Sequence, residues 1–170
     1  MKTDLRIKAK NIRKTLEIGE ISKKLVAMIR KNKAYKEAKK VMIFYPKKYE
    51  IDLRELFNDE KYFYLPRVNE DELDVCPYKL GDELKLSAFN VLEPVSEAVD
   101  ACCMDLIIVP ALLVDKNAYR LGYGGGYYDR LLYRIRNSNV KTFCAMPKDL
   151  LVETLPKDEF DIPIDEIILV

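Results

Sequence analysis

Short apolar strands that end at a proline constrain the fold of this chain more than any other feature. Three are predicted, at residues 41–45, 106–109 and 140–146, and they are followed by Pro46, Pro110 and Pro147. Apolar runs of this kind are typical of strands buried on both faces, as in a parallel sheet. Ligands bind beyond the carboxyl ends of such strands, so the loops after these prolines should border one cleft.

Helical segments separate these strands. Apolar residues recur at helical spacing over 4–16 and 20–40, which predicts two amphipathic helices. We expect further helical stretches at 51–57 and 126–136, and further strands at 62–65, 73–78, near Leu84 and at 164–170. Strands that alternate with helices predict an α/β fold, a three-layer α/β/α single domain over residues 1–170 with a mostly parallel central sheet and Rossmann-like topology.

The chain contains no histidine. This excludes Ser-His-Asp and Cys-His hydrolases, HExxH zinc enzymes and any imidazole general base. Four cysteines, at positions 76, 102, 103 and 144, form no CxxC pair and lie in or beside apolar runs, so we expect buried free thiols. Any chemistry must therefore come from Lys, Arg, Tyr, acidic residues, Cys, backbone amides or a bound metal.

The net charge of +1 conceals two segments of opposite charge. Residues 1–48 hold 16 Lys and Arg against 4 Asp and Glu, whereas residues 49–170 hold 13 against 24. The basic segment either faces an anion, such as nucleic acid, a nucleotide phosphate or a polycarboxylate, or consists of solvated helix faces. The sequence leaves both interpretations open.

No segment resembles a membrane anchor. The longest apolar run, residues 106–114, contains Pro110 and is far shorter than the ~20 residues that cross a bilayer. The first 20 residues are rich in charge, unlike a signal peptide. We expect a soluble, cytoplasmic protein without a membrane partner.

A glycine-rich loop is the strongest functional signal. Four of the six glycines lie within residues 122–126, directly before the predicted helix. Free N–H groups at a helix N-terminus bind phosphate oxygens, so a phosphate site is favoured over a tight structural turn. The loop is neither a P-loop nor GxGxxG, since Tyr127 occupies the third glycine position. Arg120 would grip a phosphate, and Asp129 is either a dipole-stabilised acid or a ligand of phosphate-bound magnesium.

These residues resemble a known signature. Val109-Pro110, Asp115 and the string RLGYGGGYYDRLL over 120–132 are similar to the signature of the 5-formyltetrahydrofolate cyclo-ligase family, and the similarity extends along the chain. Further matches in order are Lys2, Leu5, Arg6, Arg13, Pro46, Glu50-Ile-Asp, Leu65-Pro66-Arg67-Val, Leu92-Glu93-Pro94, Leu155-Pro156, Asp161 and Asp165. The chain departs from the family at Leu150, Phe160 and Leu169, where Gln, His and Thr are common.

The resemblance implies an enzyme that uses ATP and Mg²⁺ to convert 5-formyltetrahydrofolate to 5,10-methenyltetrahydrofolate, releasing ADP and phosphate. The formyl oxygen would attack the γ-phosphate, and N10 would then close the ring. The resemblance implies that ATP is held by Lys2, Arg6, Arg120, Gly122, Gly124, Gly125, Gly126, Tyr127 and Tyr128. It makes Arg120, Tyr127 and Asp129 the candidate catalytic residues, and Asp129 and Asp161 the magnesium ligands.

The same resemblance places Tyr45, Glu50, Tyr123 and Tyr127 on the substrate, a reduced folate with or without a polyglutamate tail. A carboxylate at Glu50 suits the adjacent N–H donors of a pterin, and tyrosines stack on rings, although plain packing would also explain the tyrosines.

Two rival functions remain. One is an ATP-dependent transferase or kinase that uses the same loop on another acceptor. The other is a nucleic-acid-binding module, but the basic helices lack an aromatic platform or a helix-turn-helix, so we predict no nucleic acid partner. We expect a monomer or a weak dimer.

Overall fold

The computed structural model describes residues 1–170. Its helices are α1 (Lys2–Lys14), α2 (Ile18–Lys31), α3 (Lys33–Glu37) and α4 (Tyr127–Ile135), with 3₁₀ turns η1 (Arg54–Asn58), η2 (Ala101–Cys103) and η3 (Lys148–Leu150). Its strands are β1 (Lys40–Met42), β2 (Tyr62–Asn69), β3 (Glu72–Tyr78), β4 (Leu84–Leu86), β5 (Leu92–Pro94), β6 (Leu106–Ile108), β7 (Leu113–Asp115), β8 (Arg120–Leu121), β9 (Lys141–Met146), β10 (Leu151–Val152) and β11 (Glu166–Leu169). No helix has the length and apolar character needed to cross a membrane.

Six strands form the central sheet, in the order β11-β9-β6-β1-β2-β3. All neighbours are parallel except β2 and β3, which are antiparallel. In chain order the parallel strands follow the 2-1-3-4-5 arrangement of a doubly wound fold, whose switch point lies here between β1 and β6. The predicted α/β fold with a mostly parallel central sheet is therefore confirmed.

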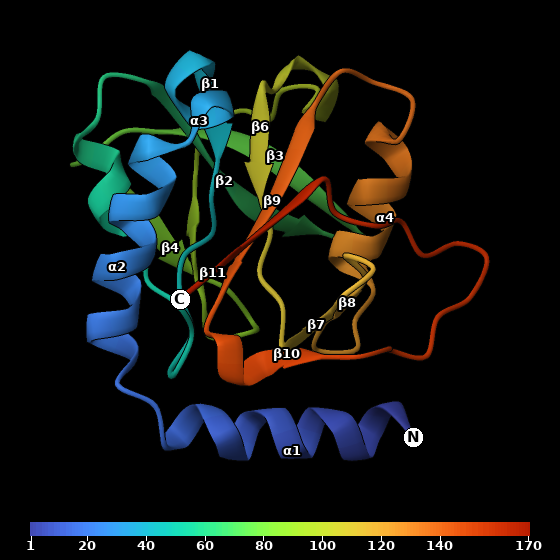
Figure 1. Cartoon of the computed structure of the whole chain (residues 1–170). Helices are drawn as coiled ribbons and strands as arrows, with labels where there is room; N and C mark the ends of the chain where they lie inside the picture. The colour runs from blue at the N-terminus through green and yellow to red at the C-terminus, as the bar shows by residue number, and fades with distance from the viewer.

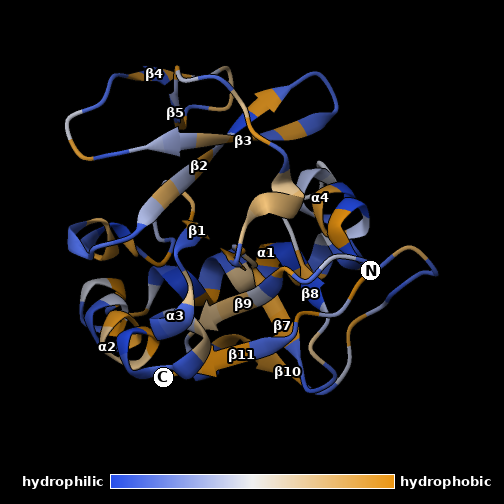
Figure 2. Cartoon of the chain, turned by 90° about the horizontal axis from the view of Figure 1, so that it is seen from above, coloured by the Kyte–Doolittle hydropathy of each residue, from blue (hydrophilic) through white to orange (hydrophobic).

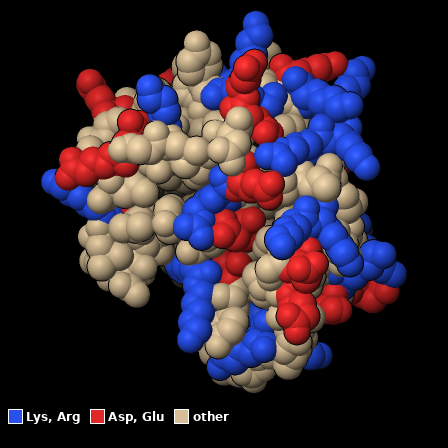
Figure 3. Space-filling view, turned by 90° about the vertical axis from the view of Figure 1, so that its left-hand side faces the viewer, with Lys and Arg blue, Asp and Glu red and all other residues tan.

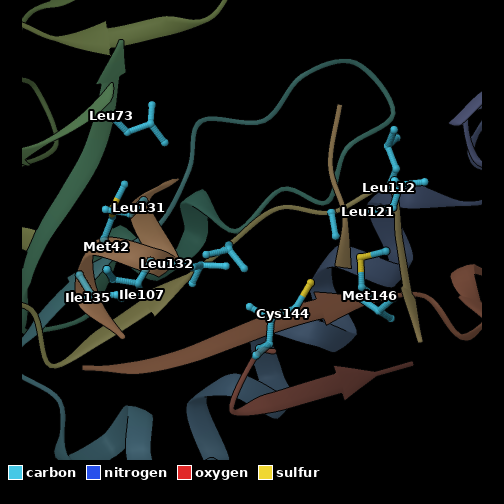
Figure 4. Packing of buried hydrophobic residues seen from close by; sticks show 14 of the residues in the cluster. Met42, Leu73, Ile107, Leu112, Leu121, Leu131, Leu132, Ile135, Cys144 and Met146 are labelled. Carbon is cyan, nitrogen blue, oxygen red and sulfur yellow. The ribbon is translucent and has the colours of Figure 1, made fainter. Parts of the chain in front are cut away.

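Helices cover both faces of this sheet (Figure 1). Val41 and Leu106 belong to a buried cluster with α2 and α3, whereas the next residues, Met42 and Ile107, belong to a cluster with α4. Figure 4 shows the second cluster, in which side chains of α4 meet those of β1, β6 and β9. Hydrophobic and hydrophilic residues alternate along α2 and α4 (Figure 2), as expected for helices that bury one face.

Helix α1 has a different position. It lies across the end of the sheet toward which β6 points (Figure 1). Ala9, in the middle of this helix, is fully buried in the cluster shared with α4. The first helix of the chain therefore covers the carboxyl edge of the sheet, where ligands bind in folds of this class.

The helix expected over 20–40 is in fact two. Helix α2 ends at Lys31 because Asn32 adopts an extended backbone with ψ of 133°. The Asn32 side-chain oxygen then accepts hydrogen bonds from the amides of Ala34 and Tyr35 and caps α3. The helical stretch expected over 51–57 is the short turn η1.

Strand β2 continues past Pro66, where we expected it to end. Strand β1 pairs only with residues 62–64, and the Ile43 amide makes the last contact, at 3.0 Å from the carbonyl of Tyr64. Successive residues of a strand direct their N–H and C=O groups to opposite sides. Residue 66 therefore faces the side of β1, but β1 has already ended at this point, so no partner is lost where proline lacks an N–H. The proline therefore breaks no ladder bond, and β2 extends to Asn69 as the partner of β3.

Two small sheets complete the fold. Strand β7 pairs with β8 in antiparallel orientation and with β10 in parallel orientation, while β4 and β5 form a separate hairpin. Strand β8 leads directly into the glycine loop of residues 122–126, and α4 follows. This arrangement presents the loop next to the ends of β1 and β6.

Candidate active site

A cavity of about 890 Å³ lies beyond the carboxyl ends of β1 and β6, with Tyr45 and Pro110 in its wall. Every residue to which the sequence assigned a site role lines it. These residues are Lys2, Arg6, Tyr45, Glu50, Arg120, Gly122, Tyr123, Gly124, Gly125, Gly126, Tyr127, Tyr128, Asp129 and Asp161. The structure thus brings together residues from both ends of the chain at the switch point of the sheet.

The glycine loop forms one wall of this cavity. Gly126 has φ of 74° and precedes the first residue of α4, so the left-handed conformation there favours glycine. No side chain caps this N-terminus, which leaves amides of the first turn available to an anion. At Gly122 a Cβ atom would lie 2.6 Å from Nη2 of Arg120, so only glycine lets the backbone approach that guanidinium.

Arg120 connects the loop to the sheet. Its side chain is only 4% exposed, its Nε donates to the carbonyl of Pro110 at 2.9 Å, and its Nη1 donates to Oδ1 of Asp129 at 3.0 Å. The Asp129 side chain is 43% exposed and retains its second oxygen for another partner. A fixed cation and a half-exposed carboxylate therefore lie side by side in the cavity.

Helix α1 supplies the basic residues on the same side. The Nε of Arg6 donates to the carbonyl of Gly122 at 2.9 Å. A Cβ atom at Gly124 would lie 3.5 Å from the Arg6 guanidinium carbon, so this side chain runs along the loop. Lys2 lines the cavity one helical turn earlier. The first two turns of α1 thus place positive charge beside the glycine loop.

Most of the other basic residues of the first segment have a different role. Only Lys2, Arg6 and Lys47 of the 16 Lys and Arg in residues 1–48 line the cavity. On the face that carries α2, basic and acidic side chains are interspersed (Figure 3), with ion pairs such as Lys23–Glu20 and Arg30–Glu55. The solvated-face interpretation therefore holds for most of this segment.

Glu50 forms an adjoining wall, which contacts the glycine loop at Tyr123. It is buried, and its two carboxylate oxygens accept from the Lys47 amide at 3.0 Å and from the Tyr123 hydroxyl at 2.8 Å. Burial, together with the nearby Glu50 carboxylate, raises the pKa of Tyr123 above its ordinary value, so this tyrosine remains a neutral donor. Each Glu50 oxygen keeps a lone pair for a ligand that presents adjacent N–H groups.

Three further tyrosines surround the space between these walls. The Tyr45 hydroxyl accepts from Nη1 of Arg54 at 2.8 Å. Tyr127 meets Phe89 edge to face, with ring centroids 5.8 Å apart. Burial raises the pKa of Tyr128, whose ring lies 5.6 Å from the Arg120 guanidinium carbon, so it stays neutral. Tyr45 and Tyr127 line the cavity, and each ring has an arginine over one face, Arg54 and Arg130 respectively, whereas Tyr128 packs beneath Arg120.

The carboxylates suit a metal that arrives with a nucleotide. No group of three or more acidic or cysteine side chains is arranged to hold a metal by itself. Asp129 and Asp161 nevertheless line the same cavity, and Mg²⁺ is commonly held by one or two carboxylates together with substrate phosphates. One oxygen of Asp161 accepts from the Asp158 amide at 2.9 Å, which orients this carboxylate.

The cavity also contains residues that the sequence did not single out. Phe89, from the segment between β4 and β5, lines it and contacts Tyr127. Arg130 and Arg134 also line it. Arg130 donates to the carbonyl of Asp71 in the turn before β3, and Arg134 to the carbonyl of Leu73 in β3. The spacing of these two arginines, one helical turn apart after the glycine loop, is the one signal that would have suggested them.

The expectation for the cysteines was half wrong. Cys76 and Cys144 are buried free thiols, but Cys102 and Cys103 are exposed, because the turn η2 lies at the surface before β6 begins. None of the four lines the cavity.

Comparison with known proteins agrees with this geometry. The model of the 5-formyltetrahydrofolate cyclo-ligase family matches residues 1–170. The chain is 28% identical over 151 residues to 5-formyltetrahydrofolate cyclo-ligase of Mus musculus, an alignment that covers 79% of this chain and 74% of the mouse protein. It is 29% identical over 122 residues to the enzyme of the same name from Escherichia coli K12, covering 68% and 67% of the two chains.

Solved structures agree as well. The NMR structure of Aquifex aeolicus 5,10-methenyltetrahydrofolate synthetase superposes with a TM-score of 0.85 and 34% identity, over 99% of this chain and 89% of that chain. The synthetase from Mycoplasma pneumoniae has the same fold, with a TM-score of 0.74 at 23% identity, over 98% and 97% of the two chains. The match of the family model along the whole chain shows that this protein belongs to the 5-formyltetrahydrofolate cyclo-ligase family.

Proposed function

We propose that this chain is an ATP-dependent cyclo-ligase that converts 5-formyltetrahydrofolate to 5,10-methenyltetrahydrofolate, with release of ADP and phosphate. The observation that carries the proposal is the pairing of two unlike walls in one cavity. Arg120 and the glycine loop suit a triphosphate, and Glu50 with Tyr123 suits a pterin.

The formyl oxygen is a poor leaving group, and phosphorylation by ATP makes it a good one. The formyl oxygen attacks the γ-phosphorus of ATP, the bond to the β-phosphate oxygen breaks, and ADP departs. N10 then attacks the activated formyl carbon and loses its proton, and the C–O bond breaks to release phosphate. The attacking oxygen carries no proton, so the first step needs no general base. Phosphoryl transfer depends mainly on positioning and charge neutralisation, which explains how a chain without histidine performs it.

On the nucleotide side, we assign the phosphates to the amides of the glycine loop and to three cations. Arg120 is nearly buried and fixed by two hydrogen bonds, so it neutralises developing charge without rearranging. Arg6 and Lys2 reach the same wall from α1. Tyr127 is the first residue of α4, whose N-terminus has no side-chain cap and therefore suits an anion.

We assign magnesium to Asp129 and Asp161. When bound with ATP, the ion would neutralise phosphate charge and hold the phosphate oxygens in place. Asp129 suits this role because Arg120 occupies only one of its oxygens.

On the folate side, we assign Glu50 to the N–H donors of the pterin and Tyr45, Tyr123 and Tyr127 to its faces and edges. The tyrosine hydroxyl that donates to Glu50 holds that carboxylate in one orientation. The substrate is a reduced folate with or without a polyglutamate tail, and the enzyme works as a monomer or a weak dimer.

The test uses the purified chain with ATP, magnesium and 5-formyltetrahydrofolate. We expect the absorbance of the methenyl product to appear near the visible edge, together with one ADP for each product formed. ADP formation that requires a different added acceptor, and that 5-formyltetrahydrofolate does not support, would indicate a kinase or transferase acting on another substrate. Tight binding of RNA or DNA with a steep salt dependence, and no binding of ATP, would instead indicate a nucleic-acid-binding module.

A further inference from the structure

Arg13, in the last turn of α1, is a buried cation without an acidic partner. Its exposure is 3%, and none of the ion pairs in the structure includes it. Its Nε is the one buried side-chain nitrogen or oxygen that has no hydrogen-bond partner. A buried charge is expensive, and an apolar side chain of similar size would avoid that cost. Packing alone therefore does not explain an arginine here.

The contacts of Arg13 lie at the ends of three neighbouring strands. Its Nη2 donates to the carbonyl of Ala111, which follows β6. The same nitrogen lies 4.0 Å from the sulfur of Met146, the last residue of β9. Its Nη1 donates at 3.2 Å to the carbonyl of Tyr49, in the loop after β1. One guanidinium thus contacts the end of β9 and the segments that follow β1 and β6.

The contact with Tyr49 acts on the folate wall. Tyr49 has φ of 65°, a left-handed conformation that is uncommon for a residue with a side chain and needs support from its surroundings. The next residue is Glu50, whose amide donates to the carbonyl of Lys47 at 3.0 Å while its carboxylate accepts from the Lys47 amide. The carbonyl that Arg13 holds belongs to the peptide bond that enters Glu50.

The other end of α1 acts on the nucleotide wall, because Arg6 donates to Gly122 in the glycine loop. The helix therefore touches the glycine loop near its start and the Glu50 loop near its end. A helix of this length is rigid compared with the loops that it contacts.

We propose that Arg13 is a positioning residue: by holding the Tyr49 carbonyl it fixes the backbone that presents Glu50 to the Tyr123 hydroxyl of the glycine loop, so that α1 supports the contact between the two walls of the cavity. The assignment of Glu50 to the folate rests on the function proposed above. The arrangement of the backbone does not depend on that function.

The experiment compares Arg13→Gln, which removes the charge and the forked donor, with Arg13→Lys, which keeps the charge but not the fork. Arg30→Gln is the matched control, since Arg30 also donates to a backbone carbonyl, that of Glu55 in η1, but lies outside the cavity. The first readout is amide hydrogen exchange at Glu50 in each full-length variant, which needs no turnover.

We expect Arg13→Gln to raise the exchange rate of the Glu50 amide and the KM for 5-formyltetrahydrofolate, each by about tenfold, the scale of a lost hydrogen bond to a charged group. The KM for ATP should stay unchanged. Arg13→Lys should raise the Glu50 exchange rate and the folate KM by a smaller factor. If Arg13→Gln does not fold, the lysine variant alone tests the proposal. Arg30→Gln should lower the melting temperature and change neither the exchange nor the folate KM.

A double-mutant cycle with Glu50→Gln tests whether Arg13 affects folate binding through Glu50. If Arg13 acts through Glu50, adding Arg13→Gln to Glu50→Gln should raise the folate KM little further. Additive losses, or unchanged exchange at Glu50 in both Arg13 variants, would overturn the proposal. A wild-type chain that does not turn over 5-formyltetrahydrofolate would refute the proposed function, and the exchange measurement would still decide whether Arg13 positions the loop.

Discussion

Asp129 is placed where either of the two roles that its sequence position allowed could be filled. It lies in the first turn of α4, where the helix dipole favours a carboxylate. Its side chain also lines the cavity and is ion-paired with Arg120. The two roles differ in their consequences, since loss of a dipole contact affects stability and loss of a metal ligand affects turnover.

We predict that Asp129→Asn lowers kcat/KM by about 100-fold, the scale for removing a charged group that acts in the transition state. The asparagine oxygen can still accept from Arg120, so the free energy of unfolding should change by less than about 1 kcal/mol. Steady-state kinetics and denaturant unfolding measure both. The control is Glu20→Gln, which removes a first-turn carboxylate from α2. Normal turnover in Asp129→Asn would assign the carboxylate to the helix dipole alone.

The cysteines give a second prediction for single residues. Burial raises the pKa of Cys144 to about 12, so its reactive thiolate is nearly absent at neutral and mildly alkaline pH. Burial also raises the pKa of Cys76. Titration of the native protein at about pH 8 with an aromatic disulfide reagent should therefore modify Cys102 and Cys103 quickly. The two buried thiols should react only after unfolding. Fast modification of all four would contradict the burial of Cys76 and the packing of Cys144, which Figure 4 shows.

The sequence predicted local features of the site better than contacts between distant residues. Glycines next to a helix start signal a phosphate site directly, and Arg120 lies two residues before them. The hydrogen bond between Glu50 and Tyr123 joins residues 73 positions apart, and no periodic pattern encodes it. The exposure of Cys102 could not be predicted either, because apolar neighbours in the sequence do not show that a short turn lies at the surface.

At the scale of elements, α1 matters because one helix carries residues for both walls. Arg6→Met removes the cation and keeps a straight side chain that favours helix. We predict a rise in the KM for ATP of about tenfold, as for a lost charge-assisted contact, with little change in the folate KM.

Lys8→Met is the control for Arg6→Met, since Lys8 is exposed on the same helix and does not line the cavity. If the two variants have the same KM for ATP, Arg6 does not contribute to ATP binding and is only a solvated surface residue.

The glycine loop gives the other prediction at this scale. A Cβ atom at residue 122 would lie 2.6 Å from Nη2 of Arg120, which two hydrogen bonds prevent from moving away easily. Gly122→Ala should therefore displace Arg120 and reduce kcat/KM by about 100-fold, the scale of a displaced catalytic group.

The matched substitution is Gly19→Ala in α2, where a Cβ atom would meet nothing within 4 Å. This variant should keep full activity and gain up to about 1 kcal/mol in the free energy of unfolding. Unchanged kinetics in Gly122→Ala would show that the loop does not need the close approach of Arg120.

Most elements could be predicted, but some of their ends could not. The helical apolar period of α1 and the continuous apolar run of β6 are clear enough to place both elements. The break at Asn32 depends on a side chain that caps the next helix, and the continuation of β2 through Pro66 depends on where β1 stops. Both boundaries depend on residues outside the segment concerned, and the apolar pattern of one segment carries no information about them.

At the scale of the whole molecule, β1, β6 and β9 lie side by side in the sheet as expected, although β1 already ends at Met42 and does not reach Pro46. Pro110 lines the cavity, whereas Pro46 and Pro147 do not. The order of the strands was not accessible from the sequence, because apolar runs show that strands are buried but not which strand pairs with which. That order puts the switch point between β1 and β6, next to the glycine loop. The location of the cavity follows from the topology, and its chemistry follows from the loops.

The most direct test of the account follows the formyl oxygen. Substrate labelled with a heavy oxygen isotope in the formyl group is incubated with the full-length enzyme, ATP and magnesium, and the phosphate released is analysed by mass spectrometry. We predict that the label appears in inorganic phosphate, one atom for each methenyl product, because this oxygen attacks the γ-phosphorus. Methenyl product formed with unlabelled phosphate would contradict the account.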